Sequence, residues 1–524
     1  MKIKTSIFIK SIISLIFSQV LIKIFGLIYT LYLTNKNGFG DRGNAIYMSG
    51  YQIYSLMLTV SSIGIPNAIA KLVAEKEALR DFKNSKRILY VSSILFGFTG
   101  FLGSILLYFK AEFIAVEVLG ISEACLSIKM LSPAVFFVSM GAVLRGYFNG
   151  KNYFKIGAKS QILEQIVKTI LTIVFLEYVG EKTDYDVKMM ASSVSMGTTL
   201  STIISFLYIV KIYYKEERLS LGRVFEGTKE SSLYILKRIL VFSFPIMLSA
   251  IISSLSKNID SITIVRILKD IVGESMALEK YGILSSKIDI LIALPLSINS
   301  SIALAIIPTV SEKIALNDIN KVEEKIIEAI DITCLIAIPC MFGMMFYSKE
   351  IFDLLFPNAR TGYELLSVAS IGIIFLSLIQ TINGILQALN KNYIYLFVSI
   401  VGIFVKVISN ILLIRIEGIY EMGAVIGNVL SGIVSFIIVN YFLHKNIKLS
   451  KGIIKISSTY IISSILMIIL SKNLLKMLSG FFINLQIISV ISIGISAIFY
   501  AICVIFIKIF QKNDLKNESW NPWK

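Results

Sequence analysis

Residues 6–33 read SIFIKSIISLIFSQVLIKIFGLIYTLYL, a run that is long and apolar enough to cross a lipid bilayer. Lys23 lies well inside this run. A cation at that depth costs several kcal/mol unless it faces protein or water, so an intramembrane lysine marks a functional site by default. The run therefore predicts a membrane protein with a polar interior, and Lys23 is its first candidate site residue.

The composition of the whole chain points the same way. Of 524 residues, 56% are hydrophobic and 16% are charged, and the mean hydropathy is +0.78, whereas soluble domains are roughly a quarter charged. The first run is too long, and lacks a small-residue cleavage site, for a removed signal peptide. Apolar runs of bilayer-crossing length lie near residues 6–33, 45–70, 88–109, 125–144, 160–178, 189–210, 239–264, 284–310, 327–347, 363–388, 393–414, 422–443, 453–471 and 481–507.

Two short segments recur about 240 residues and six spans apart. GYFNGKNY from Gly146 has a counterpart in GILQALNKNY from Gly384, and IPNAIAKLVAEKEAL from Ile65 resembles IPTVSEKIALNDI from Ile307. Chance similarity between apolar segments is the alternative, but two pairs in one register count against it. Such a duplication is typical of transporters with two bundles around a central site. We therefore predict an all-α membrane protein of fourteen transmembrane helices, with two six-helix lobes in a pseudo-two-fold relation and two C-terminal helices.

The predicted domain boundaries follow from these spans. The longest cytoplasmic loop is charged and amphipathic, and it separates the two halves. The predicted parts are an N-lobe (1–210), the connector (211–238), a C-lobe (239–443), spans 13 and 14 (444–508) and a cytoplasmic tail (509–524).

The lysines and arginines predict the orientation, because cytoplasmic loops hold an excess of them. We assign 32 of the 51 to the termini or to loops that follow even-numbered spans, counting residues near the ends of runs with the adjoining loops. We assign 15 to the alternate loops and four, Lys23, Lys168, Lys257 and Lys406, to the spans. We expect a multi-pass protein of the plasma membrane with both termini cytoplasmic. The net charge of +17 is then an insertion signal and an attraction to anionic membrane lipid. Nucleic-acid binding is a poor interpretation, because no basic patch interleaved with aromatic residues lies outside the membrane.

Polar residues within the spans fall on particular helical faces. These faces must point to other helices or to a hydrated cavity, and the alternative role is interhelical hydrogen bonding worth about 1 kcal/mol each. Four intramembrane lysines against two central acids predict a cavity that favours an anionic substrate. The candidate residues are Gln161, Glu164 and Lys168 in the fifth span, Lys257 and Asp260 in the seventh, Asn383 and Gln387 in the tenth, and Lys406 in the eleventh.

An enzymatic function finds little support. The single histidine, His444, excludes His-based metal clusters and catalytic triads, and the chain has no GxxxxGK[ST] loop for ATP. The four cysteines lack metal or redox spacing and are expected to be small core residues. We predict a non-enzyme without a cofactor. Its energy source would be the membrane potential, a Na⁺ or H⁺ gradient, or the gradient of the substrate.

Several strings resemble a known family. KIFGLIYTLYL from Lys23, RGYFNGKNYFKIGAKSQILEQIVK from Arg145 and YGILSSKIDILIALPLSINSSIALAIIPTVSE from Tyr281 are similar to the stage V sporulation protein B and MurJ-like branch of the MOP exporter superfamily. The resemblance covers nearly the whole chain through span 12. It implies a flippase for undecaprenyl-pyrophosphate-linked sugars, with lipid II as the leading candidate, that works by alternating access between two lobes for peptidoglycan or spore cortex synthesis.

The resemblance also implies site residues and partners. Basic residues that meet the pyrophosphate carry over to Lys23, and with less support to Arg42 and Arg266. Spans 13 and 14 fit the place of a groove for the lipid tail. We expect a monomer whose partners are the lipid-linked anionic sugar, membrane lipid and cell-wall synthesis proteins. The alternatives are a flippase for another polysaccharide repeat unit, a MATE-type cation-coupled drug exporter, and a non-transporting scaffold of a cell-wall complex.

Overall fold

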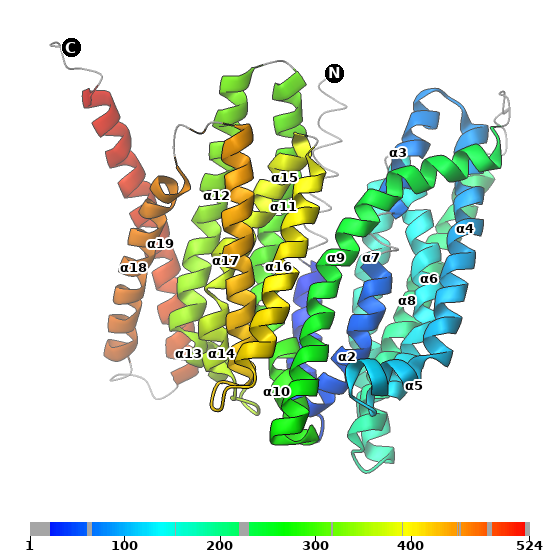
Figure 1. Cartoon of the computed structure of the whole chain (residues 1–524), viewed down its shortest axis with the longest axis horizontal. Coiled ribbons are helices and arrows are strands. Elements are labelled where there is room, and N and C mark those ends of the chain that lie inside the picture. Colours follow the sequence, from blue (N-terminus) through cyan, green and yellow to red (C-terminus); the bar gives the residue numbers. More distant parts are fainter. Residues whose placement is uncertain are drawn as a thin grey trace. The chain divides into compact units, whose positions relative to one another are not determined.

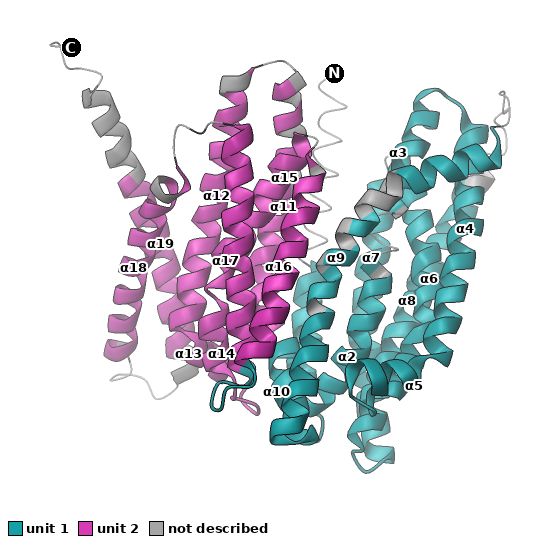
Figure 2. Ribbon diagram, in the orientation of Figure 1, with its two compact units in different colours: residues 1–287, 414–421 teal, residues 288–413, 422–524 magenta. Residues whose placement is uncertain are grey.

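The computed structural model describes residues 21–59, 65–151, 153–219, 230–315, 318–389, 391–447, 449, 452–478 and 485–518. Every regular element in these ranges is helical, as Figure 1 shows. The chain divides into two compact units, coloured separately in Figure 2: unit 1 is Met1–Lys287 with Ile414–Glu421, and unit 2 is Ile288–Leu413 with Met422–Lys524. The domain bounds expected from the sequence stay a prediction.

The first described helix of unit 1 is Leu21–Asn35. Helices α6, α7 and α8 pack against one another, and α2, α3 and α4 pack against α6. The helices of unit 1 are α2 (Gly40–Thr59), α3 (Ile65–Ala78), α4 (Phe82–Phe109), α5 (Ala111–Phe113), α6 (Ala124–Gly150), α7 (Phe154–Lys182), α8 (Val187–Leu219), α9 (Ser232–Val272) and α10 (Glu274–Gly282), with wider π-helical turns at η2 (Ile114–Leu119) and η3 (Ile283–Ile288).

The connector expected at 211–238 is helical at both of its ends. Helix α8 continues to Leu219 and α9 begins at Ser232, while residues 220–229 lie outside the described part of the chain. Figure 1 shows α9 starting beside α4 and then turning toward α10. The start of α9 buries Ile235 and Ile239 in a cluster with side chains of α3, α4 and α6.

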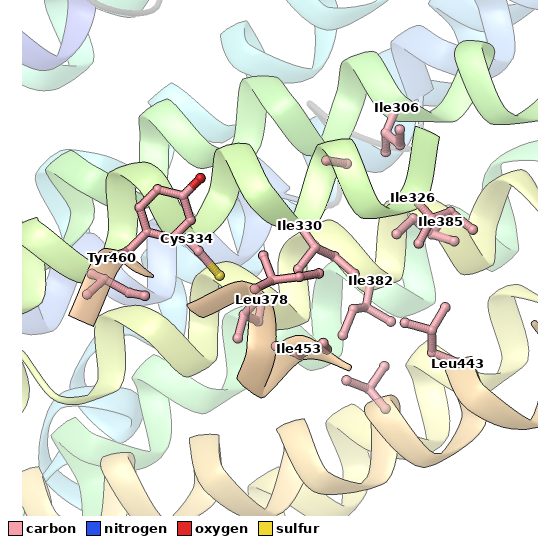
Figure 3. Packing of buried hydrophobic residues seen from close by; sticks show 14 of the residues in the cluster. Ile306, Ile326, Ile330, Cys334, Leu378, Ile382, Ile385, Leu443, Ile453 and Tyr460 are labelled. Carbon is pink, nitrogen blue, oxygen red and sulfur yellow. The ribbon is translucent and has the colours of Figure 1, made fainter. Parts of the chain in front are cut away.

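Unit 2 is a second helical bundle. Its core joins α11, α12, α15 and α18, and Figure 3 shows Ile330, Ile382 and Leu378 packed within it. The helices of unit 2 are α11 (Asp289–Ala315), α12 (Ile319–Phe346), α13 (Ser348–Leu355), α14 (Tyr363–Ala369), α15 (Gly372–Ala388), α16 (Asn392–Leu413), α17 (Glu421–Asn446), α18 (Ile453–Leu478) and α19 (Leu485–Glu518).

The helices include many that suit a membrane. Among the described residues, nine helices are long and apolar enough to cross a bilayer, or ten if α14 and α15, which meet at 41°, form one bent span. The predicted run 45–70 corresponds to two helices, α2 and α3, and residues 60–64 between them are outside the described ranges. The prediction of an all-helical membrane fold is confirmed, and the number fourteen stays a prediction.

The same close helix contact recurs in both units. A methyl group added to Gly146 on α6 would lie 2.9 Å from the carbonyl oxygen of Pro66 on α3. A methyl group added to Gly384 on α15 would lie 2.5 Å from the carbonyl oxygen of Ala303 on α11. A side chain at either position would force the two backbones apart. Both glycines begin the recurring segments of the sequence, so close helix packing explains why glycine recurs there.

Candidate functional site

The interior of unit 1 holds a lysine surrounded by tyrosines, named here the lysine–tyrosine cluster (Lys168, Tyr29, Tyr47 and Tyr51). Lys168 Nζ lies 4.2 Å from the ring centroid of Tyr51, 4.9 Å from that of Tyr29 and 5.9 Å from that of Tyr47. These distances allow cation–π attraction. Because only 5% of Lys168 is exposed, its ammonium group is held against aromatic rings away from solvent.

Three helices bring the cluster together. Tyr29 comes from the first helix of unit 1, and Lys168 comes from α7. Tyr47 and Tyr51 lie one turn apart on α2, with ring centroids 5.5 Å apart, so both rings share one face of that helix. The hydroxyl group of Tyr47 lies 3.3 Å from Thr198 Oγ1 on α8. This contact ties the cluster to a fourth helix.

One turn before Lys168, Glu164 is bound by Arg145 of α6. Arg145 Nη2 donates to Glu164 Oε2 at 2.7 Å and to Ser205 Oγ at 3.1 Å, while Arg145 Nε donates to Ser160 Oγ at 3.1 Å. The side chains of Arg145 and Glu164 are 11% and 22% exposed. The pair is therefore largely shielded from solvent and links α6, α7 and α8.

These contacts give the buried Lys168 ammonium group aromatic neighbours in place of a salt bridge. The Glu164 carboxylate is already balanced by Arg145. Within the described residues, no carboxylate oxygen lies within 4.0 Å of Lys168 Nζ. A buried cation without a carboxylate in direct contact raises the local potential and attracts an anion. The arrangement can thus hold negative charge inside a membrane protein.

Lys406 on α16 is the counterpart of Lys168 in unit 2. The two lysines are separated by 238 residues, as are Gly146 and Gly384. Lys406 is also buried, with 4% of its surface exposed. The two halves of the chain therefore each place a lysine inside a bundle of helices.

The packing one turn after each lysine is also similar. A methyl group added to Gly197 of α8 would lie 3.0 Å from the backbone nitrogen of Thr172 on α7. A methyl group added to Gly427 of α17 would lie 2.6 Å from Asn410 Oδ1 on α16. In unit 1 the glycine lets the backbones of α7 and α8 come close, whereas in unit 2 it makes room for the side chain of Asn410.

A second group of charged residues, named here the charged end of unit 1, joins α2 to neighbouring segments. Lys287 Nζ lies 2.8 Å from Asp41 Oδ2, and the Lys287 side chain is fully buried. Nearby on α2, Arg42 Nη2 lies 2.8 Å from Glu123 Oε1. Lys280 Nζ donates to both carboxylate oxygens of Glu421 at 2.7 Å, which attaches the Ile414–Glu421 segment to α10.

Asp41 lies in a tightly packed place. A methyl group added to Gly282 would lie 2.0 Å from the Asp41 carbonyl oxygen, so the end of α10 touches the start of α2. Burial raises the pKa of the Asp41 carboxyl group; Lys287 opposes the rise and Glu279 adds to it. The ion pair with Lys287 therefore forms in surroundings that disfavour a bare carboxylate.

The other predicted site residues of unit 1 lie at several places. Lys23 is exposed, one turn before Gly26, which faces Gln165 of α7. Gln161 of α7 and Asp260 of α9 are half-buried, whereas Arg266 of α9 is exposed and packs its Cγ near Gly120. The side chain of Lys257 lies outside the described part of the structure.

Two predicted site residues of unit 2 share α15. Asn383 is half-buried and Gln387 is exposed. Of the predicted residues in unit 1, the structure brings Glu164 and Lys168 into one polar interior. A substrate-binding role for any of the predicted residues stays a prediction.

The sequence reasoning missed several members of these groups. Arg145 lies just beyond the predicted run 125–144, and no sequence pattern marks the tyrosines as partners of Lys168. Asp331 of α12 is a further intramembrane acid, because it lies within the predicted run 327–347. Its position inside an apolar run is the signal that would have found it.

A family model described as polysaccharide biosynthesis protein matches residues 8–313, more than half of the chain. The chain belongs to this family. A second family model, MatE, matches residues 245–412 of this member of the polysaccharide biosynthesis proteins. Both matches agree with the MOP-superfamily resemblance drawn from the sequence. Within the described ranges, no group of three or more His, Cys, Asp or Glu side chains is placed to hold a metal ion.

Curated relatives extend the comparison over most of this family member. It is 23% identical to "Lipid II flippase MurJ" of Bacillus subtilis (strain 168), over 94% of this chain and 93% of the relative. It is 25% identical to "Stage V sporulation protein B" of the same organism, over 70% of each chain.

Solved structures share the fold. The structure titled "Lipid II flippase MurJ, inward closed conformation" superposes with a TM-score of 0.70 at 18% identity, covering 97% of this chain and 100% of that one. An inward-facing multidrug resistance MATE family transporter of the MOP superfamily has a TM-score of 0.65 at 15% identity and covers 82% of this chain and 95% of its own. The chain is thus a multi-pass membrane protein of this fold.

Proposed function

We propose that this protein is a flippase that moves an undecaprenyl-pyrophosphate-linked sugar precursor across the cytoplasmic membrane by alternating access. Lipid II is the leading candidate, for peptidoglycan or spore cortex synthesis. The observation that carries the proposal is the buried charge of Lys168, which no carboxylate of the described residues balances within 4.0 Å. A lipid pyrophosphate is a strong anion in a low-dielectric slab, and cationic side chains replace part of its hydration.

The comparisons support the same class of substrate. Similarity to a lipid II flippase extends over 94% of the chain. A shorter stretch, 29% of the chain, is 27% identical to "Probable low-salt glycan biosynthesis flippase Agl15" of Haloferax volcanii. The names of the two relatives differ, one referring to lipid II and the other to glycan biosynthesis. A flippase for another polysaccharide repeat unit is therefore the nearest variant.

The proposed architecture has fourteen spans in two six-helix lobes with two further C-terminal helices, and both termini in the cytoplasm. The repeated glycine contacts and the paired positions of Lys168 and Lys406 support the two-fold relation. Lys23, Arg42 and Arg266 are proposed to meet the pyrophosphate as the family resemblance implies. The protein would act as a monomer, in contact with membrane lipid and cell-wall synthesis proteins, with coupling to the membrane potential, Na⁺ or H⁺.

The test is reconstitution of the purified full chain in vesicles with labelled lipid II. Wild-type protein should make the label accessible on the opposite face, and Lys168→Met should slow this at least about tenfold, the effect of one lost charge-assisted hydrogen bond to the transported anion. Lys182→Met is the matched control, because Lys182 is exposed on the same helix. Normal transport by Lys168→Met would remove the main support for the proposal.

The MatE match over residues 245–412 favours a second candidate, a cation-coupled drug exporter. Such a protein would move cationic dyes out of vesicles and leave lipid II in place. A scaffold that transports nothing would fail both assays. The dye and lipid II assays on the same vesicles therefore separate the three functions.

A further inference from the structure

Helix α12 contains a proline, Pro339, inside its apolar window. In an α-helix the carbonyl of one residue accepts a hydrogen bond from the N–H four residues later. The Leu335 carbonyl would therefore accept from position 339, where proline has no N–H. The Tyr500 hydroxyl group of α19 donates to the Leu335 carbonyl oxygen at 2.9 Å. Helix α19 thus supplies the hydrogen bond that Pro339 removes from α12.

A second tyrosine contacts the same helix one turn earlier. The Tyr460 hydroxyl group of α18 donates to Asp331 Oδ1 at 2.5 Å. Tyr460 is fully buried, and Figure 3 shows it beside Cys334 in the core of unit 2. Because Asp331 and Leu335 are four residues apart, both contacts lie on one face of α12.

Both contacts satisfy polar groups of α12 for which the membrane interior supplies no hydrogen-bond partner. A carbonyl left open by proline needs a new donor, since lipid offers none. An aspartate within an apolar helix needs a hydrogen-bond partner for the same reason. Each need is met by one tyrosine, and the two tyrosines come from two different helices of the same C-terminal hairpin, whose helices α18 and α19 pack on each other.

The hairpin has an apolar surface away from these contacts. Ile498, Ile502 and Ile505 of α19 are 64%, 57% and 60% exposed and follow one stripe of the helix. Tyr500 projects about 200° around the helix from Ile498, given 100° for each residue. The polar anchor therefore faces α12, and the aliphatic stripe faces away from it.

We propose that Asp331–Tyr460 and Leu335–Tyr500 form a clasp that holds the hairpin α18–α19 on α12. Tyr460 and Tyr500 fasten the two helices of the hairpin to one face of α12, and Pro339 is what makes the Tyr500 contact necessary.

A double-mutant cycle on the purified full chain tests the clasp. Tyr500→Phe removes only the hydroxyl group and should lower the Tm. In a Pro339→Ala background, position 339 has an N–H again, so the same substitution should lower the Tm by roughly half as much or less. Tyr460→Phe should lower the Tm equally in both backgrounds, because its acceptor is Asp331. Tyr441→Phe, at an exposed tyrosine of α17, should leave the Tm unchanged. An equal effect of Tyr500→Phe in both backgrounds would overturn the clasp.

Discussion

Glu164 and Lys168 lie one helical turn apart on α7, yet they do not pair with each other. Opposite charges at this spacing attract in an isolated helix. In the folded protein, Arg145 Nη2 lies 2.7 Å from Glu164 Oε2, while Lys168 Nζ lies 4.2 Å from the Tyr51 ring centroid. Tertiary contacts therefore separate two charges that could neutralise each other locally, and substitutions at the two positions should have different effects.

Lys168→Met should leave stability unchanged or slightly higher while transport falls. Methionine keeps most of the volume and apolar contact of lysine. It removes a buried charge that has no carboxylate within 4.0 Å in the part of the chain that the structure describes. The measurements are the Tm of the purified protein and transport in vesicles. A large fall in Tm would assign the ammonium group to the fold, through its contacts with the tyrosine rings.

Glu164→Ala should impair function with a modest effect on insertion, because it leaves the Arg145 cation without its carboxylate and changes the field of the interior. Arg145→Met added to this variant should recover most of the stability. The coupling between the two positions is expected to be about 1 to 3 kcal/mol in a double-mutant cycle. Complementation by Glu164→Ala that equals wild type would instead place Glu164 among residues that only join helices.

The sequence predicted the features that depend on local pattern. The stripe on the fifth span placed Glu164 and Lys168 on one face, and the recurrence of Gly146 and Gly384 reflects a backbone contact that the structure contains. Apolar run length predicted the helical membrane fold. These signals lie in the order of residues along the chain, so they can be recognised without knowing which helices are neighbours.

The sequence could not predict which distant residue satisfies each charge. Arg145 and Glu164 are on different helices, and Lys287 is 246 residues from Asp41. How the helices pack decides which residue each charged side chain contacts. A lysine near an apolar run has the same sequence pattern whether its partner is a carboxylate or a tyrosine ring. The Leu335 carbonyl is a clearer example. The sequence shows from Pro339 that this carbonyl lacks its helical donor, but it does not show that Tyr500 is the residue that donates to it.

Asp41→Asn should destabilise the protein by about 3 kcal/mol, the cost of removing one partner from a buried ion pair. The Lys287 side chain is fully buried opposite Asp41, so its charge would face an amide. Asp41→Asn/Lys287→Met should be more stable than Asp41→Asn alone. Glu123→Gln is the comparison, since its partner Arg42 is 41% exposed and a solvated pair contributes less than about 1 kcal/mol. Equal losses for both single variants would contradict this ranking, and the Tm decides it.

Labelling of introduced cysteines tests the predicted orientation. In a chain whose native cysteines are replaced, an impermeant reagent added outside intact cells should reach a cysteine at Asp184 and miss one at Glu226. The reason is the excess of basic residues in the loops assigned to the cytoplasm. Permeabilised cells, in which both positions should react, provide the control. The reverse pattern in intact cells would discard the orientation and the lobe assignment that depends on it.

Lys23→Ala should abolish transport while the protein still inserts, and Lys23→Arg should retain much of it. The prediction follows from the depth of Lys23 in the first apolar run and its family-like KIFGLIY context, and arginine keeps the positive charge with a different geometry. The competing explanation is that Lys23 neutralises an acid such as Glu164 or Asp260 as part of the fold, although Arg145 already binds Glu164. Under that explanation Lys23→Ala lowers the Tm and is rescued by Asp260→Asn or Glu164→Gln. A substrate ligand instead stays inactive in both double variants. Unchanged transport together with an unchanged Tm in Lys23→Ala would contradict both roles.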